Sequence, residues 1–138
     1  MKDGARLYVK GKITANDMSY DGDSNQKIYC GGNAIIPHNL DSSREFKIGG
    51  NLEAHELSLT YTNYYFGGSV KCTKFNAENN DMILIVDSFE CSGTTTLNNR
   101  TSLTVNGNAK TGTINMYNDS VISVCGSMNS TNEQNLFQ

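Results

Sequence analysis

Apolar and polar side chains alternate with a period of two over most of the chain, and glycine interrupts the alternation at regular intervals. The stretch FKIGGNLEAHELSL, residues 46–59, shows the whole pattern: an apolar-x-apolar pair, a double glycine and then renewed alternation. A period of two is typical of β-strands, whereas helices repeat every 3.6 residues. The sequence therefore predicts short strands that meet at glycine positions.

The same pattern recurs along the chain, and seven segments align on the residue that closes "apolar-x-apolar-x-Gly". We call this residue the anchor. The anchors are Gly11, Gly32, Gly50, Gly68, Asp87, Gly107 and Gly126. Their spacings, by subtraction 21, 18, 18, 19, 20 and 19 residues, indicate one repeating structural unit.

Equivalent positions of the seven segments form columns of similar residues. Two residues before the anchor, the column is apolar: Val9, Cys30, Ile48, Phe66, Ile85, Val105 and Val124. Two residues after it, the column is again apolar: Ile13, Ala34, Leu52, Val70, Phe89, Ala109 and Met128. A mostly small column follows at four residues (Ala15, Ile36, Ala54, Cys72, Cys91, Thr111 and Ser130), and several segments carry an apolar residue at seven (Met18, Leu57, Phe75 and Ile114). We expect these columns to face a common core, because the positions between them are polar.

A unit of about 19 residues with three short strands cannot bury its own apolar face. Stacked units solve this problem, because each side chain then has an equivalent neighbour about 4.8 Å above and below it. The sequence therefore predicts an all-β, single-stranded parallel β-helix, or solenoid, in which each coil contributes one strand to each of three sheets. About seven coils of 18–21 residues would form one domain over residues 1–138, with coils at 7–130 and short tails at 1–6 and 131–138.

The anchor glycines are predicted to lie at corners, where positive φ and close backbone approach favour glycine. Asp87 takes this place once, and Asp tolerates left-handed geometry better than most residues. Two segments are predicted to leave the coils as loops on one face. They are DGDSNQK (21–27) and PHNLDSSRE (37–45).

Charge and hydropathy exclude several functional classes. The net charge is −3 and no basic cluster occurs, which argues against nucleic-acid binding. No apolar run approaches the roughly 20 residues that span a bilayer. The start, MKDGARLYV, lacks the pattern of a signal peptide, so a cytoplasmic location is expected.

The cysteines do not form a metal-binding pattern. There is no C-x-x-C pair and none of the four lies near a histidine, so no zinc site is expected. Cys72 and Cys91 share a column and should stack in neighbouring coils. In-register stacking points both side chains the same way, which disfavours a disulfide. We therefore expect reduced core thiols.

The segment DGDSN (21–25) carries the alternating oxygen ligands with which a calcium loop begins. An EF-hand also needs glycine at its sixth position and a carboxylate at its twelfth, where this chain has Gln26 and Gly32. A solvated loop is the better interpretation, and no metal or other cofactor is expected.

Catalytic chemistry has little support. His38 and His55 occupy different columns with no carboxylate at a matching position, so both are expected on the surface. Glu53 and Glu90 share the column three residues after the anchor, but lysines share it too, so no carboxylate cluster of a polysaccharide-cleaving β-helix forms. Threonines at 94–96, 104, 111 and 113 do not repeat in one column, which argues against an ice-binding face. We therefore expect that the protein is not an enzyme.

The two ends of the predicted rod are the most informative remaining feature, because neither shows the pattern of a cap. A solenoid without caps exposes sheet edges and core at each end. Such ends favour end-to-end stacking of identical copies. The residues predicted to mediate it are Leu7, Val9, Val124, Met128, Leu136 and Phe137.

With this period, and with segments such as FKIGGNLEAHELSL and LTVNGNAKTGTINM, the chain resembles the bactofilins, polymer-forming bacterial cytoskeletal proteins. The resemblance covers nearly the whole chain. It implies a right-handed triangular β-helix that polymerises without nucleotide and scaffolds envelope-associated proteins at the inner face of the cell envelope. Leu136 and Phe137 would correspond to the apolar C-terminal residues that help bactofilin subunits join. The N-terminal tail of bactofilins often touches membrane, but residues 1–6 are too few and too polar for that contact.

The main hypothesis is thus a non-enzymatic structural protein that self-associates through its ends. The alternative is a β-helical surface or phage-type module whose outer face binds glycans, which a secretion signal or trimerisation would favour. An enzyme ranks third, and a cluster of carboxylates on one face would revive it.

Overall fold

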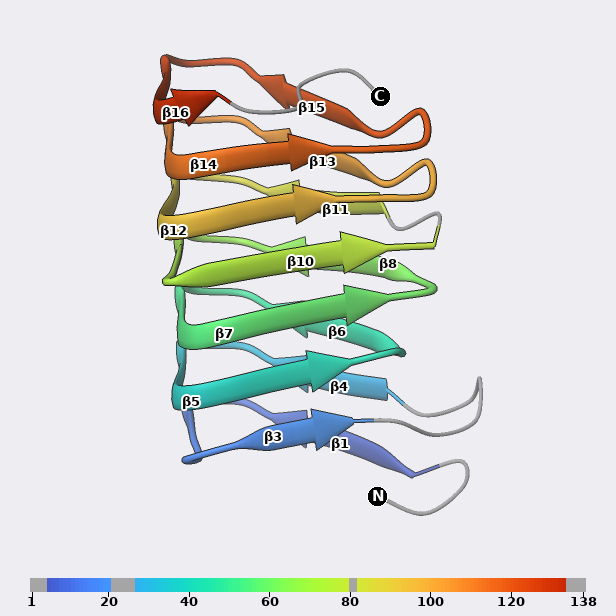
Figure 1. Ribbon diagram of the computed structural model, residues 1–138. Helices are drawn as coiled ribbons and strands as arrows, with labels where there is room; N and C mark the ends of the chain where they lie inside the picture. Colours follow the sequence, from blue (N-terminus) through green and yellow to red (C-terminus); the bar gives the residue numbers. More distant parts are fainter. Residues whose placement is uncertain (1–4, 21–26, 80–81, 134–138) are drawn as a thin grey trace.

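The computed structural model describes residues 5–20, 27–79 and 82–133, and within these ranges the protein is all-β with no helix. The strands form a parallel β-solenoid whose coils stack into a rod (Figure 1). One sheet has seven strands in the order β1-β4-β6-β8-β11-β13-β15, all parallel. These seven strands begin coils 1 to 7, so the chain makes six full turns from the first strand to the last.

The strands of this first sheet are β1 (Arg6–Val9), β4 (Lys27–Cys30), β6 (Glu45–Ile48), β8 (Asn63–Phe66), β11 (Met82–Ile85), β13 (Ser102–Val105) and β15 (Val121–Val124). The remaining strands are β2 (Ile13–Thr14), β3 (Met18–Tyr20), β5 (Ala34–Ser42), β7 (Leu52–Thr60), β9 (Val70–Cys72), β10 (Lys74–Glu78), β12 (Phe89–Leu97), β14 (Ala109–Met116) and β16 (Met128–Glu133). Coil structure therefore continues to residue 133, three residues beyond the predicted boundary.

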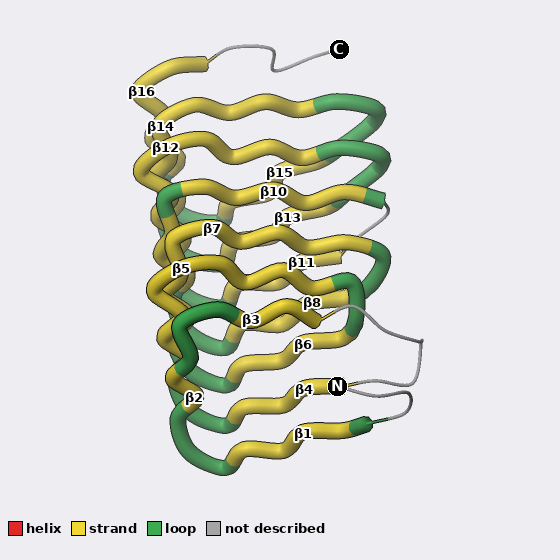
Figure 2. The backbone as a smooth tube through the Cα atoms, turned by 60° about the horizontal axis from the view of Figure 1, so that its bottom comes forward, coloured by secondary structure: helices red, strands yellow, loops and turns green. Residues whose placement is uncertain are grey.

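The sequence predicted three sheets, but the described strands form two, one of seven strands and one of nine. Each coil still has three sides, because the strands of the second sheet bend. The long strands such as β7 turn a corner at their middle, where two successive side chains, His55 and Glu56, both lie outside the core. Strict alternation cannot place two neighbours on one face, so the chain bends there. In coil 4 the same corner separates β9 from β10. Figure 2 shows the bend repeated from coil to coil.

The coil is right-handed. In Figure 1 the chain rises from β1 at the bottom to β15 at the top, while the near strands run to the right and the far strands run to the left. This is the hand that the twist of β-strands favours when parallel strands are connected.

The predicted inward columns form the core. Within coils 2 to 6, every residue two before, two after and four after the anchor is buried, and many have no exposed surface, such as Ile48, Phe66 and Val105 at 0%. The outer coils lack one neighbour, so Val9 and Val124 are half-buried there. Within the stretch 46–59, Phe46, Ile48, Leu52, Ala54, Leu57 and Leu59 all face inward as predicted.

The loop prediction for the second coil was wrong. Residues 37–42 belong to strand β5, which pairs with β7 on one side and with β2 and β3 on the other. The coil is longer by one residue at its corner, where the register shifts between Ile36 and Asn39, and this places Leu40 in the column of Leu57. The other predicted loop, DGDSNQK, lies outside the described residues except for Lys27.

Candidate functional site

The N-terminal end of the rod exposes apolar side chains. Among the described residues, strand β1 is the outermost of its sheet and pairs on one side with β4. Leu7 is 38% exposed, whereas Leu103, at the equivalent position of coil 6, is 0% exposed. Val9 is half-buried against the core of its own copy. The end of the sheet therefore leaves apolar surface and backbone hydrogen-bonding groups without partners among the described strands.

The C-terminal end repeats this arrangement. Strand β15 is outermost and pairs with β13, and β16 is outermost and pairs with β14. Ile122 and Val124 are half-buried, and Met128 is 39% exposed although its column is buried in coils 2 to 6. Leu136 and Phe137, which were predicted to join copies, lie outside the described residues. The other four predicted residues thus lie at the two ends, two at each.

The anchors lie at a corner, but the predicted positive φ was wrong for the anchor glycines, since none has a left-handed backbone. Close approach is the reason for glycine. A Cβ on Gly50 would lie 2.2 Å from Asn33 Oδ1 and 2.9 Å from the carbonyl carbon of Gly32 in the preceding coil. The side chain of Asn33 occupies this space because Oδ1 accepts a 2.9 Å hydrogen bond from the backbone N–H of Asn51.

This contact links residues in successive coils. Asn51 Oδ1 accepts a hydrogen bond from Ser69 N–H at 2.9 Å and lies where a Cβ on Gly68 would be. Asn108 Oδ1 likewise accepts a hydrogen bond from Ser127 N–H at 2.9 Å, and it lies 2.4 Å from the place of a Cβ on Gly126. An asparagine after one anchor therefore requires a glycine as the next anchor.

The exception at Asp87 supports this explanation. The preceding coil there carries Ser69 in place of asparagine, and its shorter side chain leaves room for a Cβ. Ser69 Oγ donates to Asp87 Oδ2 at 2.8 Å. The backbone bond from Asp87 N–H to Gly68 O is 3.2 Å, against 2.8–3.0 Å at the anchor glycines, so the coils separate slightly at this point.

Left-handed residues other than glycine do occur among the described residues, but at the corner that ends each of coils 3 to 6. They are Tyr61, Asn79, Asn99, Arg100, Asn118 and Asp119. The Asn118 side-chain amide donates to the side-chain oxygens of Asn98 at 2.7 Å and Asn99 at 2.9 Å. Asn99 in turn donates to Asn79 at 3.0 Å. The asparagine richness of the chain therefore serves turn geometry and cross-coil hydrogen bonds.

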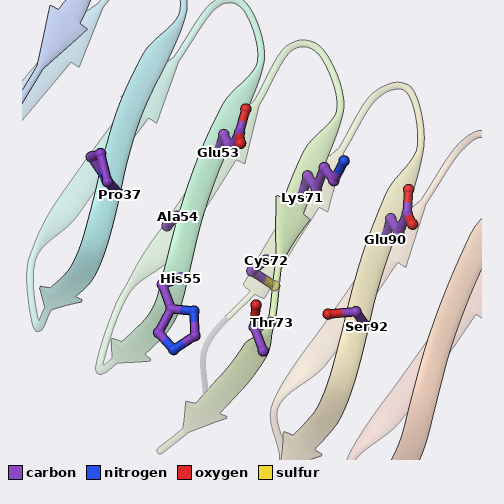
Figure 3. Close-up of a pocket in the computed structure, with 9 residues that line it drawn as sticks. All are labelled: Pro37, Glu53, Ala54, His55, Lys71, Cys72, Thr73, Glu90 and Ser92. Atoms are coloured by element: carbon purple, nitrogen blue, oxygen red, sulfur yellow. The ribbon is translucent and has the colours of Figure 1, made fainter.

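One outer side of the rod carries a column of alternating charges. Glu53, Lys71, Glu90 and Lys110 are in-register neighbours on successive coils, and all four are exposed. Figure 3 shows the first three in a row, with His55, Thr73 and Ser92 in a second row beside them and Ala54 and Cys72 turned away from them. A shallow hollow of about 260 Å³ lies along these rows. We call this surface, with Glu53, Lys71, Glu90 and Lys110 at its centre, the short face.

The outer face of the first sheet carries an aromatic and charged cluster. The rings of Tyr8 and Tyr29 stack with centroids 5.2 Å apart. Glu45 contacts Tyr29 at 2.7 Å and both Lys27 and Lys47 at 3.0 Å. Burial would raise the pKa of Glu45, but hydrogen bonds from Tyr29, Lys47 and Lys27 outweigh it and lower that pKa from 4.5 to about 2. This cluster connects coils 1, 2 and 3 on the outside.

All four cysteines are free thiols; Cys30, Cys72 and Cys91 are buried and Cys125 is exposed. Cys72 and Cys91 are register neighbours, as their shared column predicted. The hydrogen bond with Cys91, together with burial, raises the pKa of the Cys72 thiol. Cys91 Sγ also donates to Thr73 O at 3.4 Å. The pair fills core space as small apolar side chains do.

Two predictions about surface residues need correction. His38 does have a carboxylate partner, because its Nδ1 lies 3.3 Å from Asp17 Oδ2 in the preceding coil, although both side chains are exposed. Thr94 and Thr113 do share a column. An extra residue in coil 5, between Cys91 and Thr94, shifts its register, so a fixed offset from the anchor missed the match. His55 is exposed as predicted.

No group of three or more His, Cys, Asp or Glu side chains in the described ranges could hold a metal ion. No helical segment there has the length and apolar character needed to cross a membrane. The segment DGDSN (21–25), which the sequence predicts to be a solvated loop, lies outside these ranges.

Comparison with known proteins gives no assignment. No protein-family model matches the chain, and neither curated proteins nor solved structures match it.

Proposed function

We propose that the protein is a non-enzymatic structural protein that assembles end to end into filaments, as its resemblance to bactofilins implies. The observation that carries the proposal is that the two ends of the rod match in their columns. If the C-terminal coil of one copy lay beneath the N-terminal coil of the next, the parallel ladder would continue through the junction. The junction would then be one more coil-to-coil contact.

The inward columns would meet apolar on apolar. Extending the register places Ile122 of one copy under Leu7 of the next, and Val124 under Val9. Met128 would lie under Ile13 in the same way. Each of these residues loses its exposed surface in the junction, which favours association. The two open sheet edges would gain the hydrogen bonds that every interior strand makes.

Gly11 gives independent support. In the interior coils, a Cβ on an anchor glycine would lie within 3 Å of the preceding coil, but a Cβ on Gly11 would meet nothing within 4 Å. Glycine costs roughly 0.5–1 kcal/mol relative to alanine in a regular element, and the described part of a single copy contains no contact that requires it here. A coil of a second copy beneath Gly11 would impose that requirement, with Gly126 and Ser127 in the places that Gly32 and Asn33 take under Gly50.

The experiment uses two variants that each block one end. Leu7→Arg blocks the N-terminal end and Met128→Arg blocks the C-terminal end, because each places a charge between apolar side chains in the junction. At high salt, where apolar contacts persist and contacts between surface charges are screened, we expect the unchanged chain to form filaments and each variant alone to remain monomeric by light scattering. An equimolar mixture should form dimers, since one intact end of each kind remains. Met82→Arg, on an exposed side chain away from both ends, is the matched control and should still assemble.

The alternatives give different results. Dimers formed at high salt by either variant alone would show that like ends join, which would overturn the head-to-tail arrangement. An unchanged chain that stays monomeric at high concentration and several salt levels would overturn the proposed function.

A further inference from the structure

We propose that the short face is a second association surface, through which two copies pair side by side with their rod axes antiparallel. The feature that points to a second copy is the order of the charges, which reads Glu53, Lys71, Glu90, Lys110 from coil 3 to coil 6. Read in the opposite direction, the order is Lys, Glu, Lys, Glu. The column is therefore complementary to itself when one copy is turned end over end.

The symmetry is that of a two-fold axis parallel to the strands, passing between the levels of Lys71 and Glu90. This operation brings the two short faces together and reverses the rod axis. Glu53 then faces Lys110 of the second copy, and Lys71 faces Glu90. Each pair occurs twice, as in any isologous contact. Parallel pairing of the same faces would instead bring each charge against its like and is disfavoured.

The flanking columns match under the same operation. In the column on the anchor side, Asn51 would face Asn108 and Ser69 would face Ser88. In the other column, Thr73 would face Ser92, and His55 would face Gly112. These side chains are small or can both donate and accept hydrogen bonds. The hollow along Thr73 and Ser92 leaves room for the long charged side chains to approach.

The four charges are not already paired within one copy. All are exposed, and within the described ranges no ion pair joins any two of them. Opposite charges on neighbouring coils still attract along the column, so a purely internal role is the explanation that the test must exclude.

The size of the surface sets the expected strength. Six coils overlap under this operation, because coil 1 has no partner. Four residue steps by six coil spacings give roughly 380 Å² per copy, just under half of what a standard stable interface buries on each partner. We therefore expect weak, salt-sensitive pairing of single copies. The pairing does not require end-to-end assembly, but assembly would multiply it along two filaments.

The first test is zero-length carbodiimide cross-linking, which joins a carboxylate to an amine in direct contact. It is run on the Leu7→Arg/Met128→Arg chain, whose ends are blocked and whose new guanidinium groups do not react. Glu53 and Lys110 lie three coils apart in one copy, about 14 Å, so a link between them must join two copies. We expect this link in the dimer band at low salt and its loss at high salt. Links confined to neighbouring coils of one copy would overturn the proposal.

The second test separates pairing between copies from attraction within one copy. Glu53→Lys places two lysines opposite Lys110 residues and should lower the dimer fraction about tenfold. Adding Lys110→Glu restores opposite charges across the interface, although within one copy it leaves like charges side by side at 53/71 and at 90/110. We expect the double variant to recover dimer to within twofold, with a cross-link between positions 53 and 110.

If the charges act only within one copy, the double variant should have a lower dimer fraction than either single variant. That result would overturn the proposal. Glu78→Lys, an exposed charge change on another side of the rod, is the matched control and should leave the dimer fraction unchanged. Circular dichroism confirms that each variant is folded. Because both ends are blocked throughout, a negative result here and a failure of end-to-end assembly are read separately.

Discussion

Gly68→Ala tests the reason for the repeated glycine. A Cβ at this position would lie 2.1 Å from Asn51 Oδ1 and 2.8 Å from the carbonyl carbon of Gly50. The Asn51 side chain can rotate away, but then it loses the 2.9 Å hydrogen bond that it accepts from Ser69 N–H. The backbone contact remains, so coils 3 and 4 must also separate locally.

The expected cost follows from these terms. The lost hydrogen bond contributes about 0.5–1.5 kcal/mol, and overpacking of a tight contact costs about 1–3 kcal/mol. Alanine has less conformational entropy than glycine in the unfolded chain, which stabilises the folded state by about 0.4–1 kcal/mol. The free energy of unfolding should therefore fall by about 1–4 kcal/mol.

Urea denaturation followed by circular dichroism measures this change, at protein concentrations too low for assembly. The control is Gly11→Ala, the same substitution at an anchor where the new Cβ meets nothing within 4 Å. It should leave the stability of the single copy unchanged or raise it slightly, and it should weaken end-to-end assembly.

A second substitution checks the mechanism. Asn51→Ser in the Gly68→Ala chain recreates the combination that Ser69 and Asp87 already form, so part of the loss should be recovered. Equal effects of alanine at Gly11 and Gly68, or no recovery with Asn51→Ser, would refute the close-contact explanation.

Two further predictions concern the core and the outer cluster. Val105→Asp should unfold the rod or cost several kcal/mol, because Val105 is 0% exposed between stacked neighbours. Lys110→Asp, on the surface, should leave the unfolding midpoint nearly unchanged. Similar thermal shifts for both variants would contradict the column assignment. Glu45 has a pKa of about 2 in the folded chain against 4.5 for the ordinary carboxyl, so its contribution is complete above pH 4.5 and is lost as the pH falls toward 2. Between pH 5 and pH 2 the unchanged chain should lose about 1–2 kcal/mol more stability than Glu45→Gln, and parallel pH profiles in acid denaturation would show that the cluster contributes nothing.

Much of the fold could be predicted from the sequence because the repeat supplies its own alignment. A column such as Ile48, Phe66 and Ile85 is apolar in every coil, and parallel in-register stacking makes a column in the sequence a column in space. The four end residues within the described ranges were found in the same way, since the first and last members of each column lack one neighbour.

The sequence prediction missed those features that arise from the contact of one particular coil with the next. A fixed offset from the anchor fails where one coil has an extra corner residue, and this hid the match of Thr94 with Thr113. The contact of Asn33 with Gly50 is visible only when the residue after one anchor is compared with the next anchor. The alternating charges were visible in the sequence. Only the structure shows that the four side chains are exposed and lie in line on one side of the rod, where a second copy could pair with them.

Electron microscopy of the unchanged chain at high concentration tests the central claim most directly. The account predicts unbranched filaments one or two rods wide, in which copies repeat about every 34 Å along the axis at about 4.8 Å per coil. Separate short particles at every concentration and salt level would contradict it.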